Sequence, residues 1–175
     1  MKTLYKSFFA LMAATALLTS CSDDSDGDTG GGGNIPETGT YINAKVGSDP
    51  FETMSIQGFT TGAAAKTGVG ESTYITISAS AENTNTMVIT MAGVTGTGTY
   101  TLGPDSQTFV AFADMATDIM YHSSADCANV TGELKVTHFS DDKIEGTFSY
   151  TGADDDCTGS KNVTNGKFRG IYMQR

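Results

Sequence analysis

The sequence has no tryptophan, and its 175 residues contain only two histidines, three cysteines and three prolines. So few histidines and cysteines leave little for a zinc site, which usually takes three or four nitrogen or sulfur ligands. Without tryptophan, an aromatic platform for sugars would have to be built from tyrosines. Basic residues are few as well: the sequence has 10 lysines and arginines but 20 aspartates and glutamates. This acidic balance argues against nucleic acid as a partner.

The chain also has no apolar run long enough to cross a membrane. Residues 7–18, SFFALMAATALL, are apolar apart from Ser7 and Thr15 and follow two lysines, Lys2 and Lys6. A spanning helix needs about 20 such residues. A short apolar run after a basic start is typical of a secretory signal. We therefore expect residues 1–20 to be a signal peptide.

The signal ends in Leu18-Thr19-Ser20-Cys21, which resembles the bacterial lipobox. The resemblance implies cleavage before Cys21, a diacylglycerol on its sulfur and acylation of the new amine. Three acyl chains would anchor the protein stably to a membrane. The alternative is a plain secreted protein in which the cysteine stands at this position by chance.

An acidic run follows the cysteine, SDDSDGD over residues 22–28. It resembles the export signal that directs Bacteroidota lipoproteins to the cell surface, and the residues concerned are Ser22, Asp23, Asp24, Ser25 and Asp26. The alternative is a solvated spacer on a protein that faces the periplasm. We expect a lipid-anchored protein of the outer membrane, displayed on the cell surface.

The glycine-rich stretch at 29–40 is typical of a flexible tether. Residues 22–40 would reach about 25 Å end to end. Loss of residues 1–20 removes Lys2 and Lys6 but no acidic residue, so the mature chain would carry a net charge of −12.

The remaining residues, 41–175, are predicted to form one all-β domain. Apolar and polar residues alternate in 73–80, 86–93, 132–139 and 143–150, and this is the pattern of half-buried strands. Weaker strands are expected at 41–47, 51–58, 97–102, 107–113, 118–123 and 163–172. Residues 60–71 are expected to be a loop with a helical turn at Ala63–Lys66. About nine or ten short antiparallel strands predict a β-sandwich or a flattened barrel, which the sequence does not distinguish.

Three segments of this domain carry a family resemblance: YINAKVGSDPFE, GTGTYTLG and KIEGTFSYTG…VTNGKFRGIY. They resemble small lipoproteins of the Bacteroidota that are classed as a domain of unknown function. The resemblance covers about Tyr41 to Tyr172 and rests on strand and turn patterns. It implies an all-β lipoprotein and carries over no catalytic residue.

Cys127 and Cys157 remain once Cys21 is lipidated. In an exported chain, two cysteines predict a disulfide. They flank the expected hairpin of 132–139 and 143–150 at similar distances from its turn, so both should emerge at its open end. Two free, separated thiols are the alternative.

Acidic residues accompany both cysteines, and the candidates for a Ca²⁺ site are Asp126, Asp154, Asp155 and Asp156. Their spacing is not that of an EF-hand, so a solvated acidic loop is the favoured interpretation. His122 lies beside Ser123 and Ser124, but the sequence identifies no acid for a catalytic triad and no nucleophile elbow. Glu133 and Glu145 alternate with Lys135 and Lys143, which favours ion pairs between strands over glycosidase chemistry.

Together these patterns favour a surface lipoprotein that binds a ligand without catalysis. The sequence implies no cofactor and no resident metal. It leaves open whether the ligand is a protein or a glycan. The first alternative is a structural or accessory envelope subunit that associates with a larger protein. The second is a hydrolase that depends on carboxylates or Ca²⁺.

Overall fold

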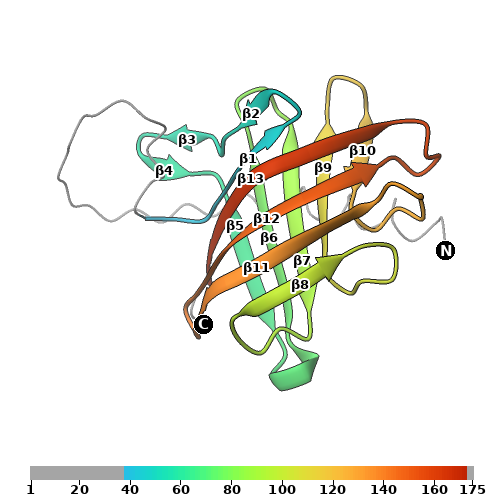
Figure 1. Cartoon of the computed structure of the whole chain (residues 1–175). Coiled ribbons are helices and arrows are strands. Elements are labelled where there is room, and N and C mark those ends of the chain that lie inside the picture. Colours follow the sequence, from blue (N-terminus) through green and yellow to red (C-terminus); the bar gives the residue numbers. More distant parts are fainter. Residues whose placement is uncertain (1–37, 173–175) are drawn as a thin grey trace. The chain divides into compact units, whose positions relative to one another are not determined.

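The protein was analysed as a computed structural model, and the structure describes residues 38–172. The expected signal peptide, Cys21, the acidic run and most of the tether lie outside this part. Within it, almost all regular structure is antiparallel β (Figure 1). The exception is one 3₁₀ turn, η1 (Gly70–Ser72). No helix in residues 38–172 is long and apolar enough to span a membrane.

Thirteen strands follow one another in residues 38–172. The first seven are β1 (Tyr41–Val46), β2 (Asp49–Phe51), β3 (Ser55–Ile56), β4 (Phe59–Thr60), β5 (Ala63–Thr67), β6 (Tyr74–Ser80) and β7 (Thr86–Ala92). The other six are β8 (Gly98–Leu102), β9 (Phe109–Asp114), β10 (Ile119–His122), β11 (Thr131–Phe139), β12 (Lys143–Ala153) and β13 (Ser160–Ile171).

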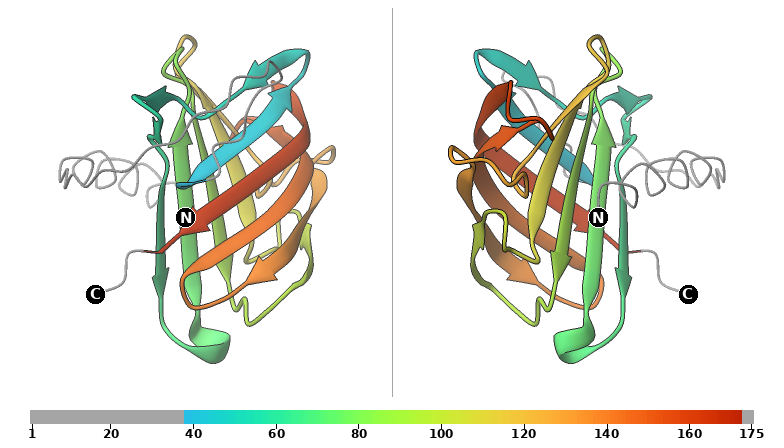
Figure 2. Two further views of the ribbon diagram at one scale, coloured as in Figure 1. Left: turned by 90° about the vertical axis from the view of Figure 1, so that its left-hand side faces the viewer. Right: turned by 90° about the vertical axis from the view of Figure 1, so that its right-hand side faces the viewer.

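Eleven of these strands form a single curled sheet. Nine of them run continuously in the order β2-β1-β13-β12-β10-β9-β7-β6-β5, and β11 and β8 branch from β12. Strand β12 pairs with β11 along most of its length and meets β10 only at Ala153, opposite His122. The sheet turns back on itself at this point and makes a half-barrel, so that β8, β11, β12 and β13 cross in front of β5, β6, β7 and β9 (Figures 1 and 2).

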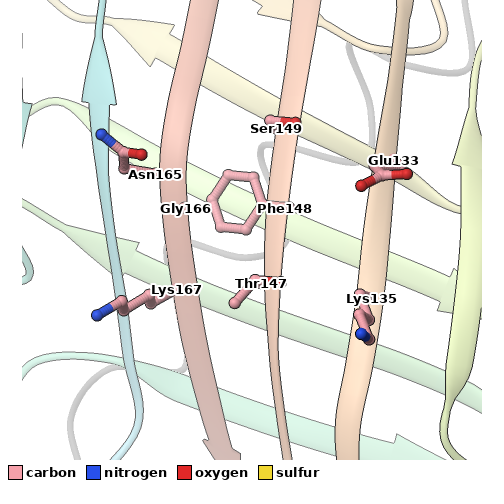
Figure 3. Close-up of a pocket in the computed structure, with 8 residues that line it drawn as sticks. All are labelled: Glu133, Lys135, Thr147, Phe148, Ser149, Asn165, Gly166 and Lys167. Carbon is pink, nitrogen blue, oxygen red and sulfur yellow. The ribbon is translucent and has the colours of Figure 1, made fainter.

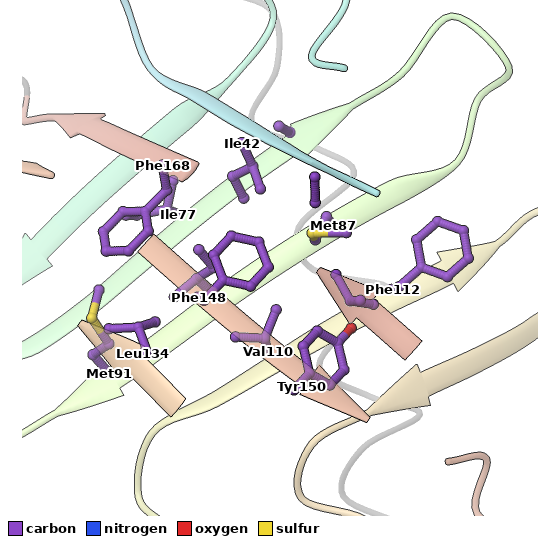
Figure 4. Packing of buried hydrophobic residues seen from close by; sticks show 14 of the residues in the cluster. Ile42, Ile77, Met87, Met91, Val110, Phe112, Leu134, Phe148, Tyr150 and Phe168 are labelled. Carbon is purple, nitrogen blue, oxygen red and sulfur yellow. The ribbon is translucent and has the colours of Figure 1, made fainter. Parts of the chain in front are cut away.

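The core fills the space between the two sides of the curled sheet. Alternate residues point inward, as the period of two requires. Ile42, Ile77, Met87, Met91, Val110, Leu134, Phe148 and Phe168 meet there from seven strands, and each is at most 4 % exposed (Figure 4). The opposite faces of β11, β12 and β13 are consequently left to polar side chains.

The all-β prediction is confirmed, and the barrel-like alternative describes the curled sheet better than two separate sheets do. The strands are more numerous than expected because several are only two or three residues long. The expectation of one strand at 51–58 was wrong: β2 ends at Phe51, and the chain reverses at Gln57 and Gly58, so that residues 55–60 form a separate two-stranded hairpin, β3–β4.

A second expectation for the strands was also wrong. Residues 63–67 are a strand, where we expected a loop with a helical turn at Ala63–Lys66. Ala63 to Thr67 pair with Ser78 to Tyr74 of β6. Alanine has little intrinsic preference for strands, but pairing with a neighbouring strand overrides such local preferences. Strand β5 also closes over the end of β13, because a Cβ on Gly170 would lie 3.0 Å from that of Ala64.

Candidate functional site

A polar groove lies on the outer face of β11, β12 and β13 (Figure 3). Its volume is about 490 Å³, and it is lined by Glu133, Lys135, Thr147, Phe148, Ser149, Asn165, Gly166 and Lys167. Six of these residues carry polar side chains. Phe148 and Gly166 are buried residues at its floor.

Strand register determines which side chains share the groove. Thr147 lies opposite Lys135 on one side and opposite Lys167 on the other. One residue pair further along β12, Ser149 lies opposite Glu133. Long side chains of β11 and β13 thus flank the short hydroxyl side chains of β12. The centre of the face is low because threonine and serine are small, and its margins are high because lysine and glutamate are long.

An irregularity in β13 lies at the edge of the groove. The pairing with β12 shifts register between Phe148 and Tyr150, and Asn165 has a left-handed backbone, with φ of 54°. A bulge of this kind bends the strand and redirects its side chains. It brings the Asn165 amide to the edge of the groove in place of regular strand pairing.

No acidic residue of the described chain neutralises either lysine of the groove. Neither Lys135 nor Lys167 forms an ion pair with any residue in 38–172. Glu133 has no ion pair in this part of the chain either, so the expected pairing of Glu133 with a strand neighbour does not form. On a protein of net negative charge, two free ammonium groups on either side of hydroxyl groups make a local site for an anion.

The charged residues beside the groove neutralise one another. Arg169 Nε donates to Glu145 Oε1 at 2.6 Å, and Lys143 Nζ lies 3.6 Å from the same oxygen. Glu145 thus forms an ion pair between strands, but its partner is Arg169 of β13, which the sequence analysis did not name, and its contact with Lys143 lies within β12. Partial burial would raise the pKa of Glu145, but the hydrogen bond and charge of Arg169, with the charges of Lys143 and His138, lower it below the usual value. The Arg169 guanidinium also lies over the Tyr41 ring, 5.5 Å from its centre.

A second polar cluster lies around the cysteines. Cys127 and Cys157 form a disulfide, with Cα atoms 5.7 Å apart, which confirms the predicted bridge. The bridge joins the segment before β11 to the loop between β12 and β13. It lies beyond the open end of the β11–β12 hairpin, where the sequence placed it.

The aspartates near the bridge do not converge on one point. Asp154 accepts hydrogen bonds from Thr158 N, Thr158 Oγ1 and Gly159 N, so that its carboxylate caps its own loop. The Gly159 N–H, followed by the Thr158 donors, lowers the pKa of Asp154. Among the described residues, no group of three or more histidine, cysteine, aspartate or glutamate side chains is placed to hold a metal ion. Asp126 and Asp156 are not part of such a group.

The structure supplies an acid for His122 that the sequence did not identify. His122 Nε2 lies 3.1 Å from Asp155 Oδ1, and Nδ1 lies 2.9 Å from Ser124 Oγ. The imidazole is almost fully buried, whereas the Asp155 side chain is 76 % exposed. The contact ties the end of β10 to the disulfide loop. Asp155 stands 33 residues beyond His122, and no short-range pattern could have connected the two.

The groove itself was missed by the sequence analysis. A signal was present, because the polar positions of β11, β12 and β13 alternate with core positions. Which of those polar residues lie side by side depends on register, and register depends on the bulge at Asn165. Alternation alone does not reveal either one.

Residues 46–171 match a family model described as Domain of unknown function (DUF6252). No curated protein matches the chain. No solved structure matches it either.

Proposed function

The chain belongs to this family of domains of unknown function, and from the geometry of its groove we propose that it is a lipid-anchored surface protein that binds an acidic glycan without catalysis. The observation that carries the proposal is the groove, in which two lysines without an ion pair in residues 38–172 flank hydroxyl and amide groups. The anchor rests on the sequence around Cys21, and the acidic run at 22–28 supports display on the cell surface.

The chemistry of the groove favours a sugar over a peptide. Thr147, Ser149 and Asn165 offer hydrogen bonds suited to hydroxyl groups, and Phe148, the apolar side chain of the lining, is buried at the floor. Lys135 and Lys167 would each pair with a carboxylate or sulfate of the ligand. Uronic-acid or sulfated oligosaccharides combine both kinds of group. Glu133 would select against ligands that carry an acid at its end of the groove.

Binding of an oligogalacturonate and of a neutral oligosaccharide of equal length would test this proposal. We expect the full chain to bind the acidic oligomer more tightly, and binding to weaken as salt is raised. The double substitution K135A/K167A should abolish most of the difference. The control is K45A, which removes an exposed lysine of β1 outside the groove. Equal affinity of the native protein and K135A/K167A would reject the groove as the site.

The anchor and the address are tested separately in cells. Cys21→Ala should leave the protein unlipidated and release it from membranes. Replacing DDSD at 23–26 by AASA should protect the domain from protease added to intact cells, whereas the native domain is cleaved. Retention of C21A in membranes would reject the lipoprotein assignment. Protection of the native protein would place it in the periplasm.

A further inference from the structure

The hairpin β3–β4 exposes two large apolar side chains at its tip. Ile56 and Phe59 pair directly across the two short strands, and they are 56 % and 71 % exposed. Gln57 and Gly58 form the turn between them, both with positive φ, as a tight two-residue hairpin loop requires. The hairpin is the separate two-stranded sheet and projects away from the curled sheet (Figure 1).

The hairpin is held firmly at its base. Met54 N donates to Ser80 O at 2.8 Å, and Thr61 N donates to Met54 O at 2.9 Å. The Thr61 hydroxyl adds a bond to Met54 O at 3.1 Å. These bonds fix the base against the end of β6. The exposed tip therefore projects from a base that is hydrogen-bonded to the curled sheet.

Charge is absent from this part of an otherwise acidic protein. No charged residue occurs between Glu52 and Lys66, a segment that includes the whole hairpin. Exposing two adjacent apolar side chains to water is unfavourable, and no charged group on the projection compensates for it. Such side chains are suited to a lipid bilayer, which is apolar beneath its polar headgroups.

The start of the described chain lies beside the same hairpin. A Cβ on Gly39 would lie only 2.4 Å from Thr60 Oγ1, and one on Gly62 would lie 2.2 Å from the backbone oxygen of Thr40. Thr60 is the last residue of β4, three residues or fewer from the tip. Between Cys21 and Thr38 there are 16 residues, and a random-coil chain of that length spans about 22 Å end to end. The described chain thus begins next to the hairpin that carries the exposed apolar pair.

We propose that the β3–β4 hairpin is a membrane-contact element that inserts Ile56 and Phe59 into the bilayer carrying the lipid anchor. The inference rests on the lipid anchor of the proposed function and goes beyond it. Two side chains would bind a bilayer weakly on their own. A short tether makes the contact intramolecular, and effective concentrations near the millimolar range then favour it. Contact at this point would fix how the domain stands on the membrane.

The absence of tryptophan provides a clean test. Phe59→Trp introduces a single fluorescent reporter at the tip, at a site exposed enough to accept it. Val69→Trp is the matched control, since Val69 is 84 % exposed and lies next to η1, far from β3–β4 (Figure 1). Both full-length lipidated variants are reconstituted into phosphatidylcholine–phosphatidylethanolamine vesicles. Flotation with the vesicles is measured first.

We expect the emission of F59W to shift to shorter wavelength and to be quenched by lipids brominated in their acyl chains. V69W should show neither effect. Adding Ile56→Ser to F59W should reduce both. Equal quenching of F59W and V69W, or none in either when both variants float, would overturn the proposal while the anchor stands. A shift in F59W that depends on protein concentration without vesicles would instead identify a second copy as the occupant. Failure of both variants to float would reject the anchor and the proposal with it.

Discussion

Gly166 of β13 lies directly opposite Phe148 of β12, and a Cβ on Gly166 would come within 2.6 Å of the Phe148 ring. The relationship is reciprocal, because Gly146 of β12 lies opposite Phe168 of β13 at the same kind of distance. The two rings pack at 6.4 Å between centres. Each phenylalanine therefore covers the bare backbone of the other strand. The floor of the groove depends on this exchange.

The first prediction concerns Gly166→Ala. The added methyl group cannot be accommodated without moving Phe148, and overpacking of this kind costs about 1–3 kcal/mol. Urea denaturation should show a lower midpoint with an unchanged slope. Gly103→Ala is the control, since nothing lies within 4 Å of its Cβ position and its φ is not positive. Equal stability of G166A and the native protein would show that the strands separate easily at this point.

The sequence showed the two glycines and the two phenylalanines of this arrangement but not which of them face one another. GTF at 146–148 and GKF at 166–168 read as similar strand fragments, and both belong to the segments that carried the family resemblance. Alternation in 143–150 predicted the half-buried strand that carries Phe148, and residues 163–172, which include Phe168, were expected as a weaker strand with no face assigned. The antiparallel register that sets each glycine against the other phenylalanine comes from the tertiary fold, including the bulge at Asn165. The same limit hid the groove and the partner of His122.

Local sequence was more informative about the disulfide. A compartment argument and symmetric spacing about one hairpin turn sufficed to pair Cys127 with Cys157. Strand β5 was missed for the opposite reason. Three alanines followed by a lysine show no alternation typical of a strand, and these residues form a strand only because they pair with β6.

The second prediction is that protonation of Glu145 lowers the stability of the fold at acidic pH. Because Arg169 and Lys143 lower its folded pKa, the ionised side chain stabilises the fold at neutral pH. That stability should be lost as pH falls below the usual glutamate value of about 4.3 and through the lower folded pKa. Urea midpoints measured from pH 7 to pH 3 should fall less steeply for Glu145→Gln than for the native protein. The same slope in both proteins would contradict the prediction. Glu133→Gln serves as the control on the neighbouring strand.

The third prediction concerns a hydroxyl group. Tyr172 Oη is buried with no hydrogen-bond partner among residues 38–172, whereas Tyr150 Oη donates to Tyr121 O at 3.4 Å. An unsatisfied buried hydroxyl is costly, so Tyr172→Phe should be neutral or stabilise by up to about 1 kcal/mol. Tyr150→Phe should cost about 1 kcal/mol. Thermal unfolding of the two variants compares them directly, and a large loss in Y172F would reveal an unrecognised partner.

The same two tyrosines predict sensitivity to base. Burial raises the pKa of both phenols above the ordinary value of 10.0. The folded protein therefore keeps these protons at a pH where the unfolded chain loses them, and stability should decline as pH rises above about 10. Y172F should show a shallower decline between pH 9 and pH 12 in urea titrations. An equally steep decline would assign the effect to other groups.

The fourth prediction is the contribution of the bridge. Cys127 and Cys157 are 30 residues apart, and closing a loop of that size stabilises by about 3–4 kcal/mol in the chain-entropy model. The double variant C127A/C157A should lose about this amount in urea denaturation. Reductant should lower the midpoint of the native protein and leave that of the variant unchanged. Two alkylatable thiols in the non-reduced protein would contradict the bridge.

The last prediction tests the absence of catalysis where the structure makes catalysis most plausible. Ser124, His122 and Asp155 are the residue types of a hydrolytic triad, and each nitrogen of the ring has a partner. Yet Ser124 follows His122 by two residues, and the carboxylate that would orient the ring is largely in water, where its charge is weakened. We expect a fluorophosphonate reagent to leave Ser124 unlabelled. Ser124→Ala should cost about 1 kcal/mol of stability through its lost hydrogen bond. Labelling of the native protein that S124A abolishes would replace the binding proposal with a hydrolase, because only an activated serine attacks such a reagent.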